Sequence, residues 1–156
     1  MDRREVGSWM SGPRAAAESA ELGYRGQRLG LPETGPGSVA GFGRRIGALV
    51  IDWFAAELAA AALARGQSGY GTSSFGWIVL GVFAAEVFLL TWLGGASFGQ
   101  RLLGLRVASL IDRPLGAFRA LARTVLLCLV VPAVIWDRDG RGMHDRAVAS
   151  VVVRAR

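Results

Sequence analysis

A chain of 156 residues has room for one compact domain, yet 52% of its residues are hydrophobic, 22 are glycine and its mean hydropathy is positive. This composition is too apolar for an ordinary soluble domain, and the apolar residues stand in long blocks separated by arginine-rich stretches, which is typical of membrane spans. The net charge of +6 comes from arginine without lysine, and it lacks the interleaved aromatic residues of a nucleic-acid patch, so it favours contact with anionic lipid.

Residues 1–38 form a different kind of sequence from the rest of the chain. They mix Gly, Pro, Ala, Glu and Arg without a sustained apolar period. Such a segment cannot bury enough apolar surface to offset the entropy lost on ordering. We expect a disordered cytoplasmic tail over 1–38 and a membrane domain over 39–156. The tail is not expected to be a secretory signal peptide, because no short apolar core follows its basic start.

Two long apolar blocks predict transmembrane helices. The first runs from Ile46 to Ala64, about 19 residues, which at about 1.5 Å per residue covers a hydrocarbon core of about 30 Å. The second runs from Phe75 to Leu93 and is of similar length. Arg44 and Arg45 precede the first block, and basic residues favour the cytoplasmic side. The loop over 65–74 carries one arginine and is therefore expected outside.

The next segment predicts a short helix and a strand. Ser97 and Gln100 have the spacing of a capping box, and Gly104 is placed to end a helix of less than two turns. The run over 105–110 alternates in part and predicts a strand, as does the β-branched run over 147–153. Because neither strand can leave its backbone unpaired at a membrane surface without cost, we expect the two to pair in an antiparallel manner.

A third apolar block runs from Leu115 to Trp136 and is less regular. It holds Arg119 and Arg123 in its first half, and its uninterrupted part, 124–136, is short for a span. Two crossings with a re-entrant or surface-lying third block would keep every arginine-rich part on the inner side, whereas three crossings would put the carboxy-terminal arginines outside. The fold class predicted is an all-α membrane protein with two transmembrane helices, a third helical segment that spans or re-enters, and the short β pairing.

Three acidic residues lie within the predicted spans: Asp52, Glu57 and Glu86. An acidic side chain at mid-helix costs about 2.5–3.5 kcal/mol on insertion scales, so each is expected to have a partner or a proton. Their functional interpretation is a coupling-ion or proton site. The structural alternative is a hydrogen bond that fixes helix packing.

For Asp52 we predict an arginine partner. Arg45 lies seven residues earlier on nearly the same helix face, but about 10 Å away along the axis. Arg119 and Arg123 share one face of the third block if that block is helical, and Arg123 is nearer the depth of Asp52. Asp145 is expected to compete for Arg45 from the cytoplasmic edge.

Three ordered motifs carry a resemblance to a known family. They read GFGRRIGALVIDW over 41–53, GQRLLGLRV over 99–107, and HDR over 144–146 before the valines of 151–153. Together they resemble the RDD family of membrane proteins, over about Val39 to Val153. The third apolar block is more compact than in the longer family pattern.

The resemblance implies which residues matter. The family is named for one arginine and two aspartates, which correspond here to Arg45, Asp52 and Asp145. Glu57 and Glu86 lie outside these motifs. The family has no established general function, and ion or proton-coupled transport is suggested for some members. The resemblance implies a multi-pass protein of the bacterial inner membrane with a cytoplasmic amino terminus.

Two functional classes remain open. One is a helix-packing or assembly module whose buried Arg/Asp network holds its helices and binds a further copy or another membrane protein. The alternative is an oligomeric ion or proton-coupled transporter. Because the only cysteine, Cys128, and the only histidine, His144, stand apart and no nucleophile, metal-ligand set or phosphate-binding loop is present in the sequence, we expect neither an enzyme nor a bound cofactor or metal. The lipid bilayer is the expected partner, and nucleic acid is not.

Overall fold

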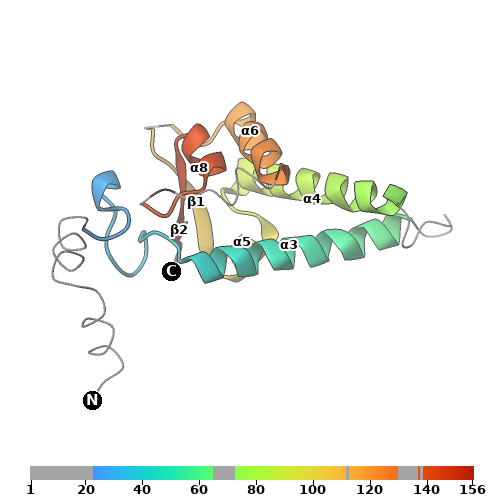
Figure 1. Cartoon of the computed structure of the whole chain (residues 1–156), viewed down its shortest axis with the longest axis horizontal. Helices are drawn as coiled ribbons and strands as arrows, with labels where there is room; N and C mark the ends of the chain where they lie inside the picture. The colour runs from blue at the N-terminus through green and yellow to red at the C-terminus, as the bar shows by residue number, and fades with distance from the viewer. Residues whose placement is uncertain (1–22, 65–72, 112, 130–136, 138) are drawn as a thin grey trace, which may run out of the picture.

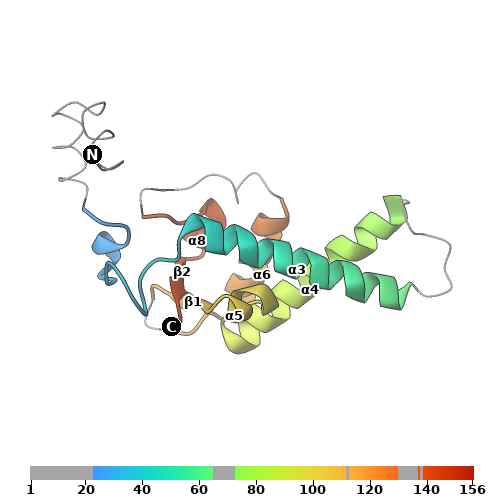
Figure 2. The ribbon, with the colours of Figure 1, turned by 90° about the horizontal axis from the view of Figure 1, so that it is seen from below.

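A computed structural model describes residues 23–64, 73–111, 113–129, 137 and 139–156 of the protein (Figure 1). Its elements in chain order are η1 (Gln27–Leu29), α3 (Phe42–Leu63), α4 (Ser73–Gly94), α5 (Phe98–Leu102), β1 (Leu105–Ser109), α6 (Ala117–Cys128), α8 (Met143–Ala147) and β2 (Ser150–Arg154). The two long helices extend to one side, and the short elements gather at the opposite end (Figures 1 and 2).

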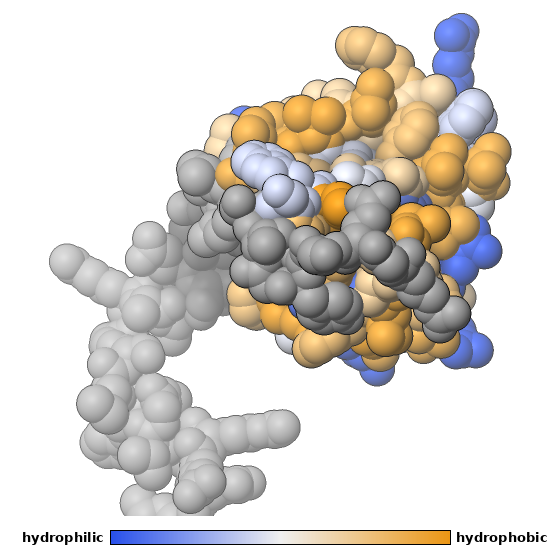
Figure 3. All heavy atoms as spheres, turned by 90° about the vertical axis from the view of Figure 1, so that its right-hand side faces the viewer, coloured by the Kyte–Doolittle hydropathy of each residue, from blue (hydrophilic) through white to orange (hydrophobic). Residues whose placement is uncertain are grey.

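The long helices α3 and α4 confirm the two predicted apolar helices. Each has 22 residues, and at about 1.5 Å per residue this length matches a hydrocarbon core of about 30 Å. In the described part of the chain they are the two helices long and apolar enough to cross a membrane. Most of their side chains face outward, and seen from the far end of the helices the described surface is largely hydrophobic (Figure 3). An apolar exterior is costly in water but not in lipid.

Small residues on α3 let its neighbours approach closely. Ala48, Ala56 and Ala60 are buried at intervals of four or eight residues and face the inside of the protein, while Phe54 and Leu58 on the other faces are exposed. Residues spaced by four share one face of a helix. The same buried face also carries an acidic residue, which is described with the site.

The short elements form a cap around a two-stranded sheet. Strands β1 and β2 are antiparallel, with Val107 opposite Val152, so the predicted antiparallel pairing is confirmed. The second strand begins later than the predicted 147–153, because Ala147 ends α8. The amide of Ala40 donates to the Val152 carbonyl at 2.9 Å, just before α3 begins. The amide of Val107 donates to the Gly95 carbonyl at 2.7 Å, just after α4 ends. The start of α3, the end of α4 and the last strand therefore lie together at one end.

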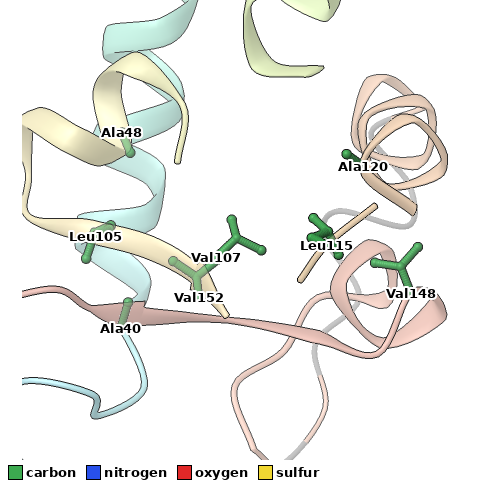
Figure 4. Packing of buried hydrophobic residues seen from close by; sticks show 8 residues of the cluster. All are labelled: Ala40, Ala48, Leu105, Val107, Leu115, Ala120, Val148 and Val152. Carbon is green, nitrogen blue, oxygen red and sulfur yellow. The ribbon is translucent and has the colours of Figure 1, made fainter. Parts of the chain in front are cut away.

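A small core holds this cap to the helices (Figure 4). Its buried members come from α3, both strands, α6 and the segments beside them: Ala40, Ala48, Leu105, Val107, Leu115, Ala120, Val148 and Val152. Burying a Val or Leu side chain contributes about 1.5–3 kcal/mol. The cluster therefore makes the sheet part of the membrane domain's packing.

Part of the predicted tail is ordered against the cap. Within 23–38, residues Gln27–Leu29 form η1, and the amide of Gly37 donates to the Arg154 carbonyl at 2.8 Å. Ser38 is buried, because its backbone lies beside β2. Backbone hydrogen bonds to β2 order this segment, which its polar side chains cannot do because they bury little apolar surface. The prediction for 1–22 falls outside the described residues.

The third apolar block contains α6, whose 12 residues are too few to span a membrane. This helix packs against α4 and α8, and the rest of the block, 130–136, lies outside the described residues. Its buried face includes Arg123, while Phe118, Leu121 and Val125 are exposed on the other side. A helix that buries its charged face and exposes its apolar face is suited to lipid rather than to water. The described residues therefore give no third span.

Candidate functional site

The most deeply buried charged group is Asp145 on α8, which is 0% exposed. Its Oδ1 accepts a hydrogen bond from Arg123 Nε on α6 at 2.8 Å. Its Oδ2 lies 3.5 Å from Arg45 Nη1 on α3. One carboxylate thus joins three helices that are far apart in the sequence. The expected competition of Asp145 for Arg45 is confirmed.

Further contacts extend this network to β2. Arg45 Nη2 donates to the Val152 carbonyl at 2.9 Å, and Ser150 Oγ donates to Asp145 Oδ1 at 3.3 Å. His144 Nε2 lies 3.5 Å from Asp145 Oδ2. Burial alone would raise the pKa of this carboxyl, but Arg123, His144 and Arg45 together hold it below its usual value. Asp145 is therefore ionised at neutral pH.

Asp52 has a different environment from the one predicted. Its Oδ2 accepts a hydrogen bond from Ser97 Oγ at 2.6 Å, and its Oδ1 accepts one from the Gly99 amide. Among the described residues no arginine lies within ion-pair distance of Asp52, so the predicted pairing is wrong. The physical reason is that the amides in the first turn of α5 have no helical acceptors and donate to the carboxylate instead. Arg45 and Arg123 pair with Asp145 on α8.

The approach of α5 to α3 requires a glycine. A Cβ at Gly99 would lie 2.2 Å from the Ala48 carbonyl oxygen, so backbone meets backbone at this point. The predicted capping box is confirmed: Ser97 Oγ accepts from the Gln100 amide at 3.3 Å, and the Gln100 side chain accepts from the Ser97 amide at 3.1 Å. The Ser97 hydroxyl therefore caps α5 and binds Asp52 at the same time.

A second acidic residue from the other long helix reaches the same turn. Glu86 Oε1 on α4 accepts a hydrogen bond from the Phe98 amide at 2.8 Å. Asp52 and Glu86 thus hold α5 from α3 and α4. Glu57 is half-buried on α3 and makes no hydrogen bond or ion pair with the described residues. The predicted group of three acids is reduced to two.

A comparison with known protein families covers the region that holds these residues. A model of the RDD family matches residues 39–149. The chain belongs to the RDD family. Comparison with curated proteins gives no match, and neither does comparison with solved structures.

In this RDD domain the three eponymous positions separate into two groups. Arg45 and Asp145 belong to one buried ionic network, whereas Asp52 binds the α5 turn. The expected contact of Arg45 with Asp145 is present, whereas the partners of Asp52 differ from those predicted.

Sequence reasoning missed other polar contacts of the RDD domain. Arg119 Nε donates to the Val148 carbonyl at 2.9 Å and its guanidinium also reaches the Ala149 carbonyl at 3.0 Å, where the backbone has a φ of 49°. This arginine fixes α6 to the turn before β2. In the described residues no three His, Cys, Asp or Glu side chains are placed to hold a metal ion.

Proposed function

We propose that this RDD-family protein is a helix-packing and assembly module of the bacterial inner membrane. One observation carries the proposal: the buried carboxylate of Asp145 joins α3, α6, α8 and, through Ser150 and Arg45, β2. A buried ion pair is weak evidence for stability, since apolar residues often replace it without loss, but it can specify one arrangement of the elements it joins. We infer that the network fixes the shape that the domain presents to its partners.

The orientation proposed places the cap in the cytoplasm. The cap lies beside Arg44, Arg101 and Arg106 in the chain, whereas the sequence between the two long helices carries one arginine, Arg65. Positive charge is retained on the cytoplasmic side. A carboxy-terminal reporter enzyme that is active only outside should therefore be inactive, and the same reporter inserted after Gly66 should be active. The reverse pattern would overturn the orientation.

The proposed partners are a second copy of the chain or another membrane protein. The exposed apolar side chains of α3 and α6, such as Leu58 and Phe118, are the surfaces available for such contacts. Cross-linking in native membranes should trap a discrete complex of the parent protein, should lose it in Asp145→Asn, and should keep it in Asp137→Asn, which alters a more exposed ion pair. A parent protein that cross-links to nothing would contradict the assembly role.

A second candidate function is ion or proton-coupled transport by an oligomer. It is favoured by the meeting of Asp52 and Glu86 at α5, within the predicted membrane depth. Glu86 Oε2 and Thr91 Oγ1 are buried and have no hydrogen-bond partner among the described residues. Acidic side chains at this depth are often functional.

The decisive variant for transport is Glu86→Gln, because its amide oxygen can still accept from the Phe98 amide while the side chain no longer titrates. Proton or sodium flux into liposomes should fall to background in this variant and stay at the parent rate in Glu57→Gln. Equal flux in both variants, or no flux in the parent, would exclude this function.

A further inference from the structure

A cavity of about 590 Å³ lies between α3, α4 and α6, beside the Asp145 network. This volume is within the range of about 300–1,000 Å³ found for small-molecule sites. Most of the lining is apolar, and the polar members gather around the network. The polar part of the lining includes Arg45, Arg123, His144 and Asp145, and the apolar part includes Val50 and Trp53.

The lining changes from polar to apolar along α3. Arg45 stands one turn inside the start of the helix, and the residues that follow on the lining continue to Phe54 without another charge. From Arg45 to Phe54 the rise is about 14 Å, at about 1.5 Å per residue. A hydrocarbon core of about 30 Å has leaflets about half as thick. The apolar wall is therefore about as long as one leaflet is thick.

The polar end of the cavity contains a buried donor that has no acceptor among the described residues. It contains two arginines, Arg45 and Arg123, against one carboxylate, Asp145. Arg123 is 2% exposed, and its Nη1 has no hydrogen-bond partner among the described residues. A buried donor without an acceptor costs free energy, and a guanidinium matches the oxygens of a phosphate group.

We propose that this cavity holds an anionic phospholipid, with its phosphate against Arg123 and an acyl chain along α3 from Ile46 to Phe54. The phosphate supplies the acceptor that the buried Nη1 needs. The acyl chain covers side chains such as Val50 and Trp53, which are 47% and 42% exposed in the protein alone. The site is distinct from the proposed assembly role and does not depend on it.

The first test compares lipids on the full-length protein. Native mass spectrometry in detergent would measure retention of phosphatidylglycerol and of phosphatidylcholine with identical acyl chains. We expect about tenfold tighter binding of the anionic lipid, which corresponds to about 1.4 kcal/mol. Inorganic phosphate alone should not displace it at equal concentration. Equal retention of both lipids, or displacement by phosphate, would overturn the proposal.

The second test fills the cavity without touching the ionic network. Val50→Trp places a large side chain in the lining, and Leu58→Trp is its control, because Leu58 is 75% exposed on the same helix but does not line the cavity. The anionic lipid should bind at least about tenfold more weakly to the first variant, a loss of about 1.4 kcal/mol, and equally well to the second. Equal binding to both variants would contradict the site.

A third measurement locates the acyl chain on α3. Phosphatidylglycerol with a photoreactive acyl chain should label the peptide over 46–54 of the parent protein more than the end of α3 around Leu63, which is also exposed. Uniform labelling of α3 would mean ordinary lipid contact and would refute the proposal. Cross-links between two copies through Val50→Cys would identify a second chain as the occupant, and would also refute it.

Discussion

Replacing Asp145 by asparagine should destabilise the protein far more than any change to an exposed ion pair. The parent carboxylate is 0% exposed, lies 2.8 Å from Arg123 and 3.5 Å from Arg45, and accepts a further hydrogen bond from Ser150. Asparagine keeps the shape but removes the charge, so two buried guanidinium groups lose their counter-ion. Removing one partner of a buried ion pair costs about 3–5 kcal/mol.

The matched control is Asp137→Asn. Asp137 lies 3.0 Å from Arg141, a similar distance, but the side chains are 18% and 16% exposed. This partly buried pair should contribute less than the fully buried one, closer to the value of about 0–1 kcal/mol for a solvent-exposed pair. The free energy of unfolding of both variants would be measured by titration of the detergent-solubilised protein with sodium dodecyl sulfate.

A free energy of unfolding of Asp145→Asn within about 1 kcal/mol of the parent value, the range of an exposed pair, would contradict a structural role for the buried pair. A double variant, Arg123→Met with Asp145→Leu, adds a second check. It removes the stranded charge of Arg123 along with the carboxylate, so it should be less destabilised than the sum of the two single changes. Exact additivity would mean that the two side chains do not interact.

Three further predictions concern packing, capping and pH. Gly99→Ala should cost about 1–3 kcal/mol of stability, because its Cβ would collide with the Ala48 carbonyl, while Gly43→Ala, whose Cβ meets nothing within 4 Å, should be neutral or stabilising by up to about 1 kcal/mol; thermal unfolding in detergent compares them. Ser97→Ala should lower the unfolding free energy by about 0.5–2 kcal/mol through the lost helix cap, and unchanged stability would contradict the observed capping box. The stability difference between the parent and Asp145→Asn should shrink as the pH falls below about 4, because a lowered pKa gives stability that is lost on protonation; a difference that grows in acid would contradict this sign.

The long helices and the sheet pairing could be predicted because their signals are local. Continuous apolar runs of the right length mark α3 and α4, and β-branched residues mark β2. The capping box was readable from the spacing of Ser97 and Gln100 alone. Each of these features depends on residues within one segment.

The partner of Asp52 could not be predicted, because it depends on tertiary packing. Helix period placed Arg45 and Asp52 on nearly one face, but Arg45 contacts Asp145, the competitor that the sequence also indicated, 100 residues later in the chain. Nothing in the local sequence indicated that Gly99 would bring the α5 amides against Asp52. The order of the motifs identified the residues, and only their positions in space assigned the contacts.

The Asp145 network joins the cap to the membrane helices, and amide hydrogen exchange of the full-length protein in lipid nanodiscs tests this most directly. In the parent, β2 should be protected together with α3, since Arg45 binds both Asp145 and the Val152 carbonyl. Asp145→Asn should increase the exchange rate of β2 by at least about tenfold while leaving α4 unchanged, whereas Asp137→Asn should alter neither. Rapid exchange of β2 in the parent, or equal protection of β2 in the parent and in Asp145→Asn, would contradict the account.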